Sequence, residues 1–206
     1  MEIGLVDSIG RPGGNLTGLT GFDVNVVSKR LQLLHELVPA ARSIAYLHNP
    51  ANPHFSAAEM KELLVAAGVL AVRLVGLSAS SNGELDAAFA GLAEQQVGAV
   101  LVGTDPFFIG ARNHIVTLAA RHSMPAIFPF REDATAGGVI GYGPNIEAMF
   151  HVVGTYTGRL LRGERVADMP VQRATRIEMA INLKTAKALS LPVPPTLLAR
   201  ADEVIE

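Results

Sequence analysis

The chain has 206 residues, a formal net charge of −2 at pH 7 and an apolar fraction of 49%. This length can bury a core, the charge is too small to predict a nucleic-acid partner, and no run reaches the ~18 apolar residues of a membrane span. The chain has no Cys, which excludes disulfides, thiolate metal sites and cysteine nucleophiles.

A glycine-rich loop with the sequence GRPGGN lies near the start of the chain, at 10–15. It matches neither common phosphate-binding glycine motif, and it precedes an expected strand at 16–20 rather than a helix. We therefore interpret it as a tight turn. Residues 1–10 have no basic start and no sustained apolar stretch, so no signal peptide is visible.

Strand and helix patterns alternate through the middle of the chain. Short apolar runs bounded by turn residues predict strands at 43–48, 70–77, 99–102, 126–128 and 139–142. Apolar residues at helical spacing predict helices between them, with the stripes Val27, Leu31, Leu34 and Val38, then Leu85, Ala88, Phe89 and Leu92, then Ile115, Leu118 and Ala119. This order predicts an α/β fold with a parallel sheet flanked by helices.

The C-terminal third continues the alternation less regularly. The pattern predicts a helix at 148–162 that ends at Gly163, an extended stretch at 166–173, a strand at 177–181 and a helix at 183–189.

Three polar or aromatic loops follow expected strands, at 48–54, 103–109 and 129–133. Ligands of parallel α/β sheets bind beyond the carboxyl ends of the strands, on the loops that lead into helices. These three loops are therefore the candidate ligand contacts.

The first of these loops has the sequence HNPANPH. Asn49 and Asn52 offer donors and acceptors, and the following helix N-terminus attracts a carboxylate or another anion. Asn52 directly before Pro53 also fits a helix N-cap that needs no ligand. His48 and His54 flank the loop, where a contact with solute competes with a surface or packing role.

The other two loops supply a carboxylate, aromatic rings and a guanidinium group. Asp105 either caps the following helix or holds a ligand ammonium group. Phe108 shares a helical stripe with Ile115 and is expected in the core, which leaves Phe107 to stack on a ligand. Arg131 either clamps a carboxylate in two-point geometry or forms a solvated salt bridge.

No set of residues predicts catalysis. The six His include no i, i+4 pair of the kind that binds zinc on a helix. No G-x-S-x-G nucleophile motif is present. We therefore expect a binding protein rather than an enzyme, with no catalytic residue, no metal site and no cofactor.

Several segments resemble the ABC transporter substrate-binding protein family, whose better-known members take up tryptophan or other aromatic amino acids. They are GRPGGNLTGLT (10–20), NPANP (49–53), PAIFPFRE (125–132) and GGVIGYGPN (137–145). Two later segments, INLKTAKAL (181–189) and LLARADEVIE (197–206), add a further signature.

The resemblance implies a two-lobe fold of the periplasmic-binding-protein type I kind, with solute bound between the lobes and an ABC permease as partner. The family works in the periplasm. Compared with that pattern, we expect the chain to be truncated at its amino end. We therefore expect 1–22 to be a remnant of the first lobe and a hinge strand, 23–130 to form the complete second lobe, and 131–206 to cross to the incomplete first lobe and back.

The expected function is the solute-binding component of an ABC importer, which binds a small molecule such as an amino acid. The alternatives are a ligand-sensing regulatory domain of the same fold and a small α/β enzyme. In an incomplete lobe, the apolar face of the helix at 149–161 would lack its partner. We therefore also expect a homo-oligomer that forms through this face.

Overall fold

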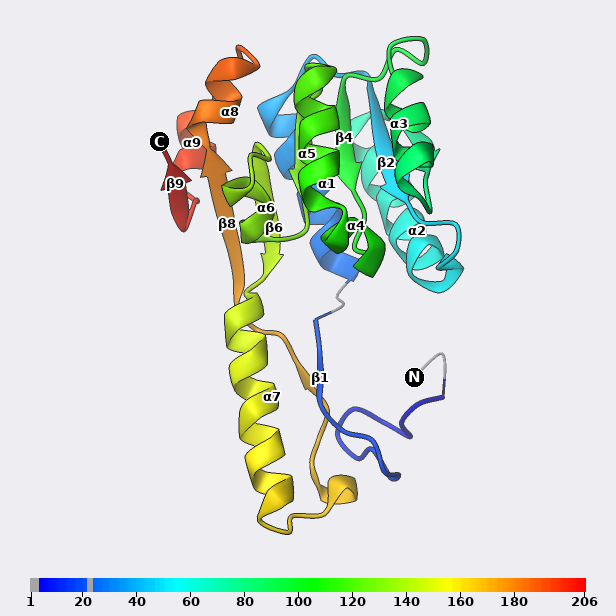
Figure 1. The fold of residues 1–206 in the computed structure, drawn as a ribbon, viewed down its shortest axis with the longest axis vertical. Helices are drawn as coiled ribbons and strands as arrows, with labels where there is room; N and C mark the ends of the chain where they lie inside the picture. Colours follow the sequence, from blue (N-terminus) through cyan, green and yellow to red (C-terminus); the bar gives the residue numbers. More distant parts are fainter. Residues whose placement is uncertain (1–3, 22–23) are drawn as a thin grey trace. The chain divides into compact units, whose positions relative to one another are not determined.

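The structure is a computed structural model that describes residues 4–21 and 24–206 (Figure 1). The chain forms two compact units: the smaller unit holds 1–23 and 144–177, and the larger unit holds 24–143 and 178–206. Among the helices that the structure describes, none is both long enough and apolar enough to cross a membrane.

The larger unit is built on a seven-stranded sheet with the order β3-β2-β4-β5-β6-β8-β9. Its strands are β2 (Ser43–His48), β3 (Arg73–Ser78), β4 (Ala99–Val102), β5 (Ala126–Phe128), β6 (Ile140–Pro144), β8 (Ile177–Asn182) and β9 (Glu203–Ile205). The pairs β2–β3, β2–β4, β4–β5, β5–β6 and β8–β9 are parallel, as the alternation of strand and helix predicts.

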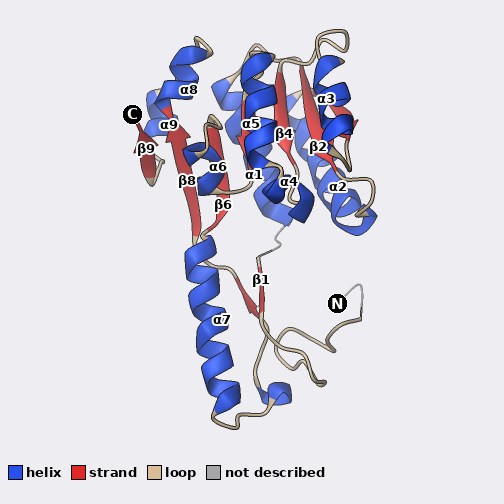
Figure 2. Ribbon diagram, viewed as in Figure 1, coloured by secondary structure: helices blue, strands red, loops and turns tan. Residues whose placement is uncertain are grey.

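Helices cover both faces of this sheet (Figure 2). One face packs on α1 (Val24–Leu37), α2 (Pro53–Leu70), α8 (Leu183–Ala188) and α9 (Pro195–Leu198). The other face packs on α3 (Asn82–Ala90), α4 (Pro106–Gly110) and α5 (Arg112–Arg121). A short helix, α6 (Arg131–Thr135), follows β5. A strand buried on both faces carries a continuous apolar run, which is why β2 and β4 are readable from the sequence.

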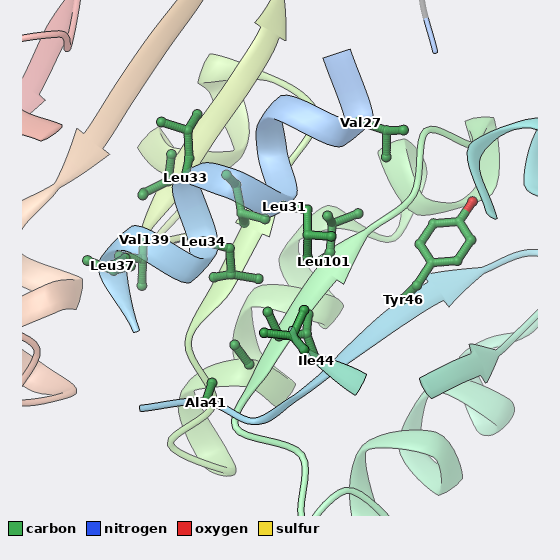
Figure 3. Close-up of a cluster of buried hydrophobic side chains, with 14 of the residues drawn as sticks. Val27, Leu31, Leu33, Leu34, Leu37, Ala41, Ile44, Tyr46, Leu101 and Val139 are labelled. Atoms are coloured by element: carbon green, nitrogen blue, oxygen red, sulfur yellow. The ribbon is translucent and has the colours of Figure 1, made fainter. Parts of the chain in front are cut away.

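The apolar stripe predicted for the first helix forms the centre of one core layer. Leu31 and Leu34 of α1 are fully buried, together with Ile44 of β2 and Leu101 of β4. Figure 3 shows these side chains gathered between α1 and the sheet. Truncating such a side chain to Ala costs about 2–5 kcal/mol because the cavity only partly collapses.

The predicted strands at 43–48, 99–102 and 126–128 are confirmed by β2, β4 and β5. The strand predicted at 70–77 starts too early, because α2 continues to Leu70 and ends on Ala71 in the left-handed region, with φ of 53°. The helix is apolar on several sides near its end, so its last turn resembles the start of a buried strand.

The smaller unit pairs β1 (Leu19–Thr20) in parallel with β7 (Gln172–Arg173) and packs α7 (Ile146–Leu161) beside them. The helix predicted at 148–162 is confirmed, and Gly163 follows it with φ of 94°. The strand expected at 16–20 is shorter. The stretch expected to be extended at 166–173 begins with a 3-10 turn, η1 (Val166–Asp168).

Two long-range hydrogen bonds organise the interior of the smaller unit. The Tyr156 hydroxyl donates to the Pro170 carbonyl oxygen at 2.6 Å. The Thr17 hydroxyl donates to the Met169 carbonyl oxygen, also at 2.6 Å. Met169 itself is fully buried. The bond from Thr17 joins the segment before β1 to the turn after α7, and the bond from Tyr156 holds that turn against α7.

The unit bounds differ from the lobe bounds expected from the sequence. Residues 131–143 and 178–206 lie in the larger unit together with 24–130, instead of forming a separate set of crossing segments. Assignment of the larger unit to a second lobe, and of the smaller unit to part of a first lobe, remains a proposal.

Candidate functional site

The carboxyl ends of β2 and β4 lie next to each other, because Leu47 pairs with Val102 in the parallel ladder. The Gly103 N–H donates to the Leu47 carbonyl oxygen at 2.9 Å. A Cβ at position 103 would lie 2.8 Å from that same oxygen and 3.0 Å from a ring carbon of Tyr46. Glycine therefore allows the loop after β4 to approach the loop after β2.

Three side chains meet where these loops approach, and we call them the Asp105 cluster (Asn49, Asn52 and Asp105). The Asn49 amide donates to Asp105 Oδ1 at 2.9 Å, and the Asn52 amide donates to Asp105 Oδ2 at 3.0 Å. Asp105 is 5% exposed. The structure thus brings together three of the six side chains predicted to contact solute.

Asp105 also caps α4, since its Oδ1 accepts the Phe107 N–H at 2.9 Å. The capping alternative for Asp105 is therefore confirmed. The prediction that the Asn52 side chain caps α2 is wrong. Asn52 occupies the N-cap position of α2, but its side chain accepts no N–H of the first turn and donates to Asp105 instead.

Among the described residues, the side chains of the other three predicted contacts form no hydrogen bond or ion pair with this cluster. His54 is exposed in the first turn of α2. The Phe107 ring is half-buried and lies 5.5 Å from the Phe108 ring. Phe108 is 3% exposed, which confirms its predicted place in the core. Arg131 pairs through Nη1 with Glu203 at 3.0 Å, so the salt-bridge alternative is present.

A narrow pocket lies beside the Asp105 cluster, with a volume of about 10 Å³. That is room for roughly one water molecule. His48 lines the pocket and stacks on Tyr46 with 5.6 Å between ring centroids. Its Nδ1 is buried with no hydrogen-bond partner among the described residues, and burial lowers the pKa of this imidazole. His48 is therefore a neutral group next to the cluster at pH 7.

A buried polar network lies behind the cluster and was missed by the sequence analysis. Glu59 Oε2 accepts the Tyr46 hydroxyl at 2.8 Å and the Thr104 N–H at 3.1 Å. Arg30 donates to Thr104 Oγ1 at 2.8 Å and to the Val102 carbonyl oxygen at 3.1 Å. These bonds fix Thr104, the residue immediately before Asp105.

The network shifts the pKa values of its members in opposite ways. Burial lowers the pKa of Arg30, although the nearby Glu59 carboxylate opposes this. Burial also raises the pKa of the Tyr46 hydroxyl, and Glu59 adds to that effect. A sequence signal existed, because Glu59 shares the i, i+4, i+8 stripe of α2 with the buried Leu63 and Ala67.

The smaller unit contains a larger pocket, with a volume of about 230 Å³. Its polar lining comes mainly from Asn145, Gln172, Arg173, Thr175 and Arg176. None of these residues was singled out in the sequence. The Asn145 side chain caps α7 by accepting the Ala148 N–H at 2.6 Å, so it is part of the fold as well as of the pocket wall.

Comparison with known proteins identifies clear relatives. The sequence model of a family described as ABC transporter substrate binding protein matches residues 1–205. A protein of Clostridioides difficile named tyrosine-binding protein is 26% identical over 93% of this chain and 54% of its own length. The chain therefore spans about half the length of that curated relative.

Two solved structures share the fold. A conserved domain protein from Vibrio cholerae has a TM-score of 0.88 and 23% identity, over 99% of this chain and 68% of the other. The ABC domain in complex with L-Trp from Streptococcus pneumoniae has a TM-score of 0.87 and 22% identity, over 100% and 70%. These likenesses support the α/β architecture of solute-binding proteins with a parallel sheet flanked by helices.

Proposed function

Because this chain belongs to the ABC transporter substrate-binding protein family, we propose that it is the solute-binding component of an ABC importer. The observation that carries this proposal is the match of the family model to 1–205, which includes both units. In this role the protein binds a small molecule without converting it, and it delivers the solute to a membrane permease. The proposed place of action is outside the cytoplasmic membrane, as in the family.

An amino acid with an aromatic side chain is the proposed solute. The relative from Clostridioides difficile is named for tyrosine, and the solved structure from Streptococcus pneumoniae contains L-Trp. The Asp105 cluster supports an amino acid because a carboxylate held by two amides suits a ligand ammonium group. The neutral His48 next to it adds no competing cation.

The proposed contacts follow from the positions of the side chains. Asp105 holds the solute ammonium group, while Asn49 and Asn52 orient the carboxylate of Asp105 and offer their remaining amide groups. Phe107 is half-buried at the start of α4 and is proposed to stack on the aromatic side chain.

His54 and Arg131 are proposed as contacts at the margin of the site. His54 is exposed at the start of α2, next to the loop that carries Asn52. Arg131 is bound to Glu203, and its Nε lies 3.8 Å from Glu178 Oε1. A solute carboxylate would therefore have to compete with two carboxylates of the protein for this guanidinium group.

Binding is proposed to act by population shift between two lobes. Solute that touches both lobes stabilises the closed state in proportion to its extra contacts there. The larger unit provides the second lobe in this proposal, and the smaller unit provides part of the first.

Self-association through α7 is a further part of the proposal. Phe150 is 71% exposed, Val153 is 43% exposed and Leu161 is 84% exposed. These apolar side chains on one helix support an interface with another copy, because covering them removes apolar surface from water.

Thermal unfolding in the presence of amino acids tests the proposed solute. We expect L-Trp or L-Tyr to raise the midpoint by a few degrees at a concentration well above Kd, whereas Asp or Lys leaves it unchanged. In Asp105→Asn the ligand-induced rise should disappear, measured against the midpoint of that variant without ligand. Asp86→Asn on the exposed side of α3 is the matched control and should keep the full rise. A rise of equal size in both variants would contradict the proposed role of Asp105.

A further inference from the structure

The sheet of the larger unit has two edges, and they differ in how well they are protected. The strand β9 has three residues, one of which is Glu203, and Glu206 follows it closely. The strand β3 has six residues with the sequence RLVGLS, and its single charge, Arg73, is at one end. Short or charged edges resist pairing with other chains, while long, neutral edges permit it. The edge at β3 is therefore the one open to pairing.

The direction of the free backbone groups of β3 follows from two hydrogen bonds. The Arg73 N–H donates to the Arg42 carbonyl oxygen at 2.9 Å, and the Ala79 N–H donates to the His48 carbonyl oxygen at 3.1 Å. In a parallel ladder the N–H and C=O of alternate residues point to opposite sides. The backbone groups of Leu74, Gly76 and Ser78 thus point away from β2, toward the free side of the sheet.

We propose that β3 pairs with β3 of a second copy of this chain, antiparallel about a two-fold axis that passes beside Gly76. In this register Gly76 lies opposite Gly76 of the partner subunit. Leu74 lies opposite Ser78 of the partner subunit. In each of these pairs, each residue donates one backbone hydrogen bond and accepts another. This is possible because the N–H and C=O groups that point away from β2 in one copy face the same groups of the other copy.

The side chains of β3 are compatible with this self-pairing. On the face toward α2, the large Leu74 lies opposite the small Ser78 of the partner subunit. The two-fold axis passes between the two copies of Gly76, which have no side chain to obstruct the contact. On the other face, Val75 meets Leu77 of the partner subunit, which is an apolar cross-strand pair. Arg73 meets Ala79 of the partner subunit, so no like charges are placed opposite each other. The sizes of the facing side chains, and the lack of facing like charges along β3, make a second copy of this strand a suitable partner.

The helix α2 supplies apolar surface next to this edge. A Cβ on Gly76 would lie 3.8 Å from Met60 Cε, so α2 overlies β3 at the proposed axis. One turn beyond Met60, on the same side of α2, Leu64 is 58% exposed, whereas Val65 at 66% and Val69 at 82% lie on the side turned away from Met60. Residues 63–72 carry no charged side chain. A helix that is apolar on its outer side as well as its inner side is normally covered.

The size of this surface predicts a weak dimer. The exposed part of Leu64 amounts to roughly half an apolar side chain per copy. With the strand edge added, the contact stays below the ~800 Å² per partner of a standard interface. We therefore expect association weaker than about 1 μM and strongly dependent on protein concentration.

Sedimentation velocity over a concentration series of the 206-residue chain tests this proposal. The series is run on Phe150→Glu, which removes the proposed α7 contact, and this chain should shift from monomer to dimer as concentration rises to several hundred micromolar. Gly76→Lys and Gly76→Glu, each made on that background, should remain monomeric, because two like charges would meet on the axis. An equimolar mixture of the two variants should associate again, because opposite charges then meet there. Each variant should fold, since the nearest atoms to a Cβ at this position lie 3.6 Å and 3.8 Å away.

A matched control makes the result specific to this edge. Gly110→Lys on the Phe150→Glu background adds the same charge at another open glycine, and it should dimerise like Phe150→Glu alone. A Phe150→Glu chain that stays monomeric throughout would overturn the proposal. Dimerisation of Gly76→Lys on that background as strong as that of Phe150→Glu alone would overturn it too.

Discussion

Arg30 of α1 and Glu59 of α2 form a buried ion pair, with 3.6 Å between Arg30 Nη2 and Glu59 Oε1 and 3% of each side chain exposed. The pair joins two helices of one layer and fixes the loop that carries Asp105, because both side chains bond to Thr104. A buried pair contributes little net stability compared with apolar residues, but loss of one partner is costly because the other charge remains buried.

We therefore expect Arg30→Met to lower the free energy of unfolding by about 3–5 kcal/mol. Urea unfolding followed by circular dichroism measures this change. The double variant Arg30→Met with Glu59→Gln should recover part of the loss, because Gln is uncharged and keeps an oxygen for the Tyr46 hydroxyl and the Thr104 N–H. A single variant that costs less than about 1 kcal/mol would show that the charge of Glu59 is satisfied without Arg30.

Replacement of the carboxylate at the centre of the Asp105 cluster should also lower stability. Asp105→Ala removes the acceptor for the Asn49 and Asn52 amides and the cap of α4, so we expect a loss of about 2–4 kcal/mol. Asp86→Asn changes an exposed carboxylate and should stay within about 0.5 kcal/mol of the natural chain. Equal stability of the two variants would mean that the cluster is not held together by Asp105.

The link between α1 and α9 should depend on pH. Glu36 accepts the Thr196 hydroxyl at 2.6 Å and pairs with Arg200, and the hydrogen bond from Thr196 is the main cause of the lowered pKa of Glu36. A carboxyl group whose pKa is lower in the folded state stabilises the fold above its unfolded pKa of about 4.5. That stabilisation is lost as the pH falls through the lower, folded value.

Glu36→Gln should therefore cost about 0.2–1 kcal/mol at pH 7, a range that allows for screening of this partly exposed group by solvent. The difference between variant and natural chain should shrink toward zero as the pH falls below about 4. Urea midpoints at several pH values test this. If the difference in stability between the variant and the natural chain grew as the pH fell, the pKa of Glu36 would be raised on folding, which would contradict the lowered pKa.

Close backbone approach explains two glycines of β6. A Cβ on Gly143 would overlap the carbonyl oxygen of Pro129, and a Cβ on Gly141 would overlap that of Phe130. Because these are backbone atoms they cannot move aside cheaply, so Gly143→Ala should lose at least about 3 kcal/mol of stability or fail to fold. Gly68→Ala, in an open position of α2, should instead gain about 0.5–1 kcal/mol. Similar effects at the two positions would contradict this explanation.

The sequence specifies most of the larger unit because its strands are buried on both faces. The runs at 43–48 and 99–102 are bounded on both sides by polar residues or turns, so their ends are clear as well. The helix α6 and the strand β9 were not predicted. The helix α6 has five residues, too few for a period of 3.6 to be recognised. The strand β9 is as short as β5, but it includes Glu203 and is only partly buried, so no continuous apolar run marks it.

The sequence predicts which loops form the candidate site, but it does not predict which hydrogen bonds their side chains make. Topology places the ends of β2 and β4 together, and for that reason the loops that carry Asn49, Asn52 and Asp105 could be expected to meet. Which partner each side chain would choose depends on competing local contacts. Asn52 had both a helix N-terminus and a carboxylate within reach, and only three-dimensional geometry decides for the carboxylate.

Both units are discontinuous in sequence, and this has a consequence for the order of events on the ribosome. The smaller unit needs 144–177 as well as the start of the chain, and the larger unit needs 178–206. The strand β8 lies inside the sheet, between β6 and β9, so the sheet is completed only after residue 205 has been made. At about 5–20 residues per second, the nascent chain spends several seconds without its final strands. Translation therefore leaves a period in which the emerging polypeptide is incompletely folded.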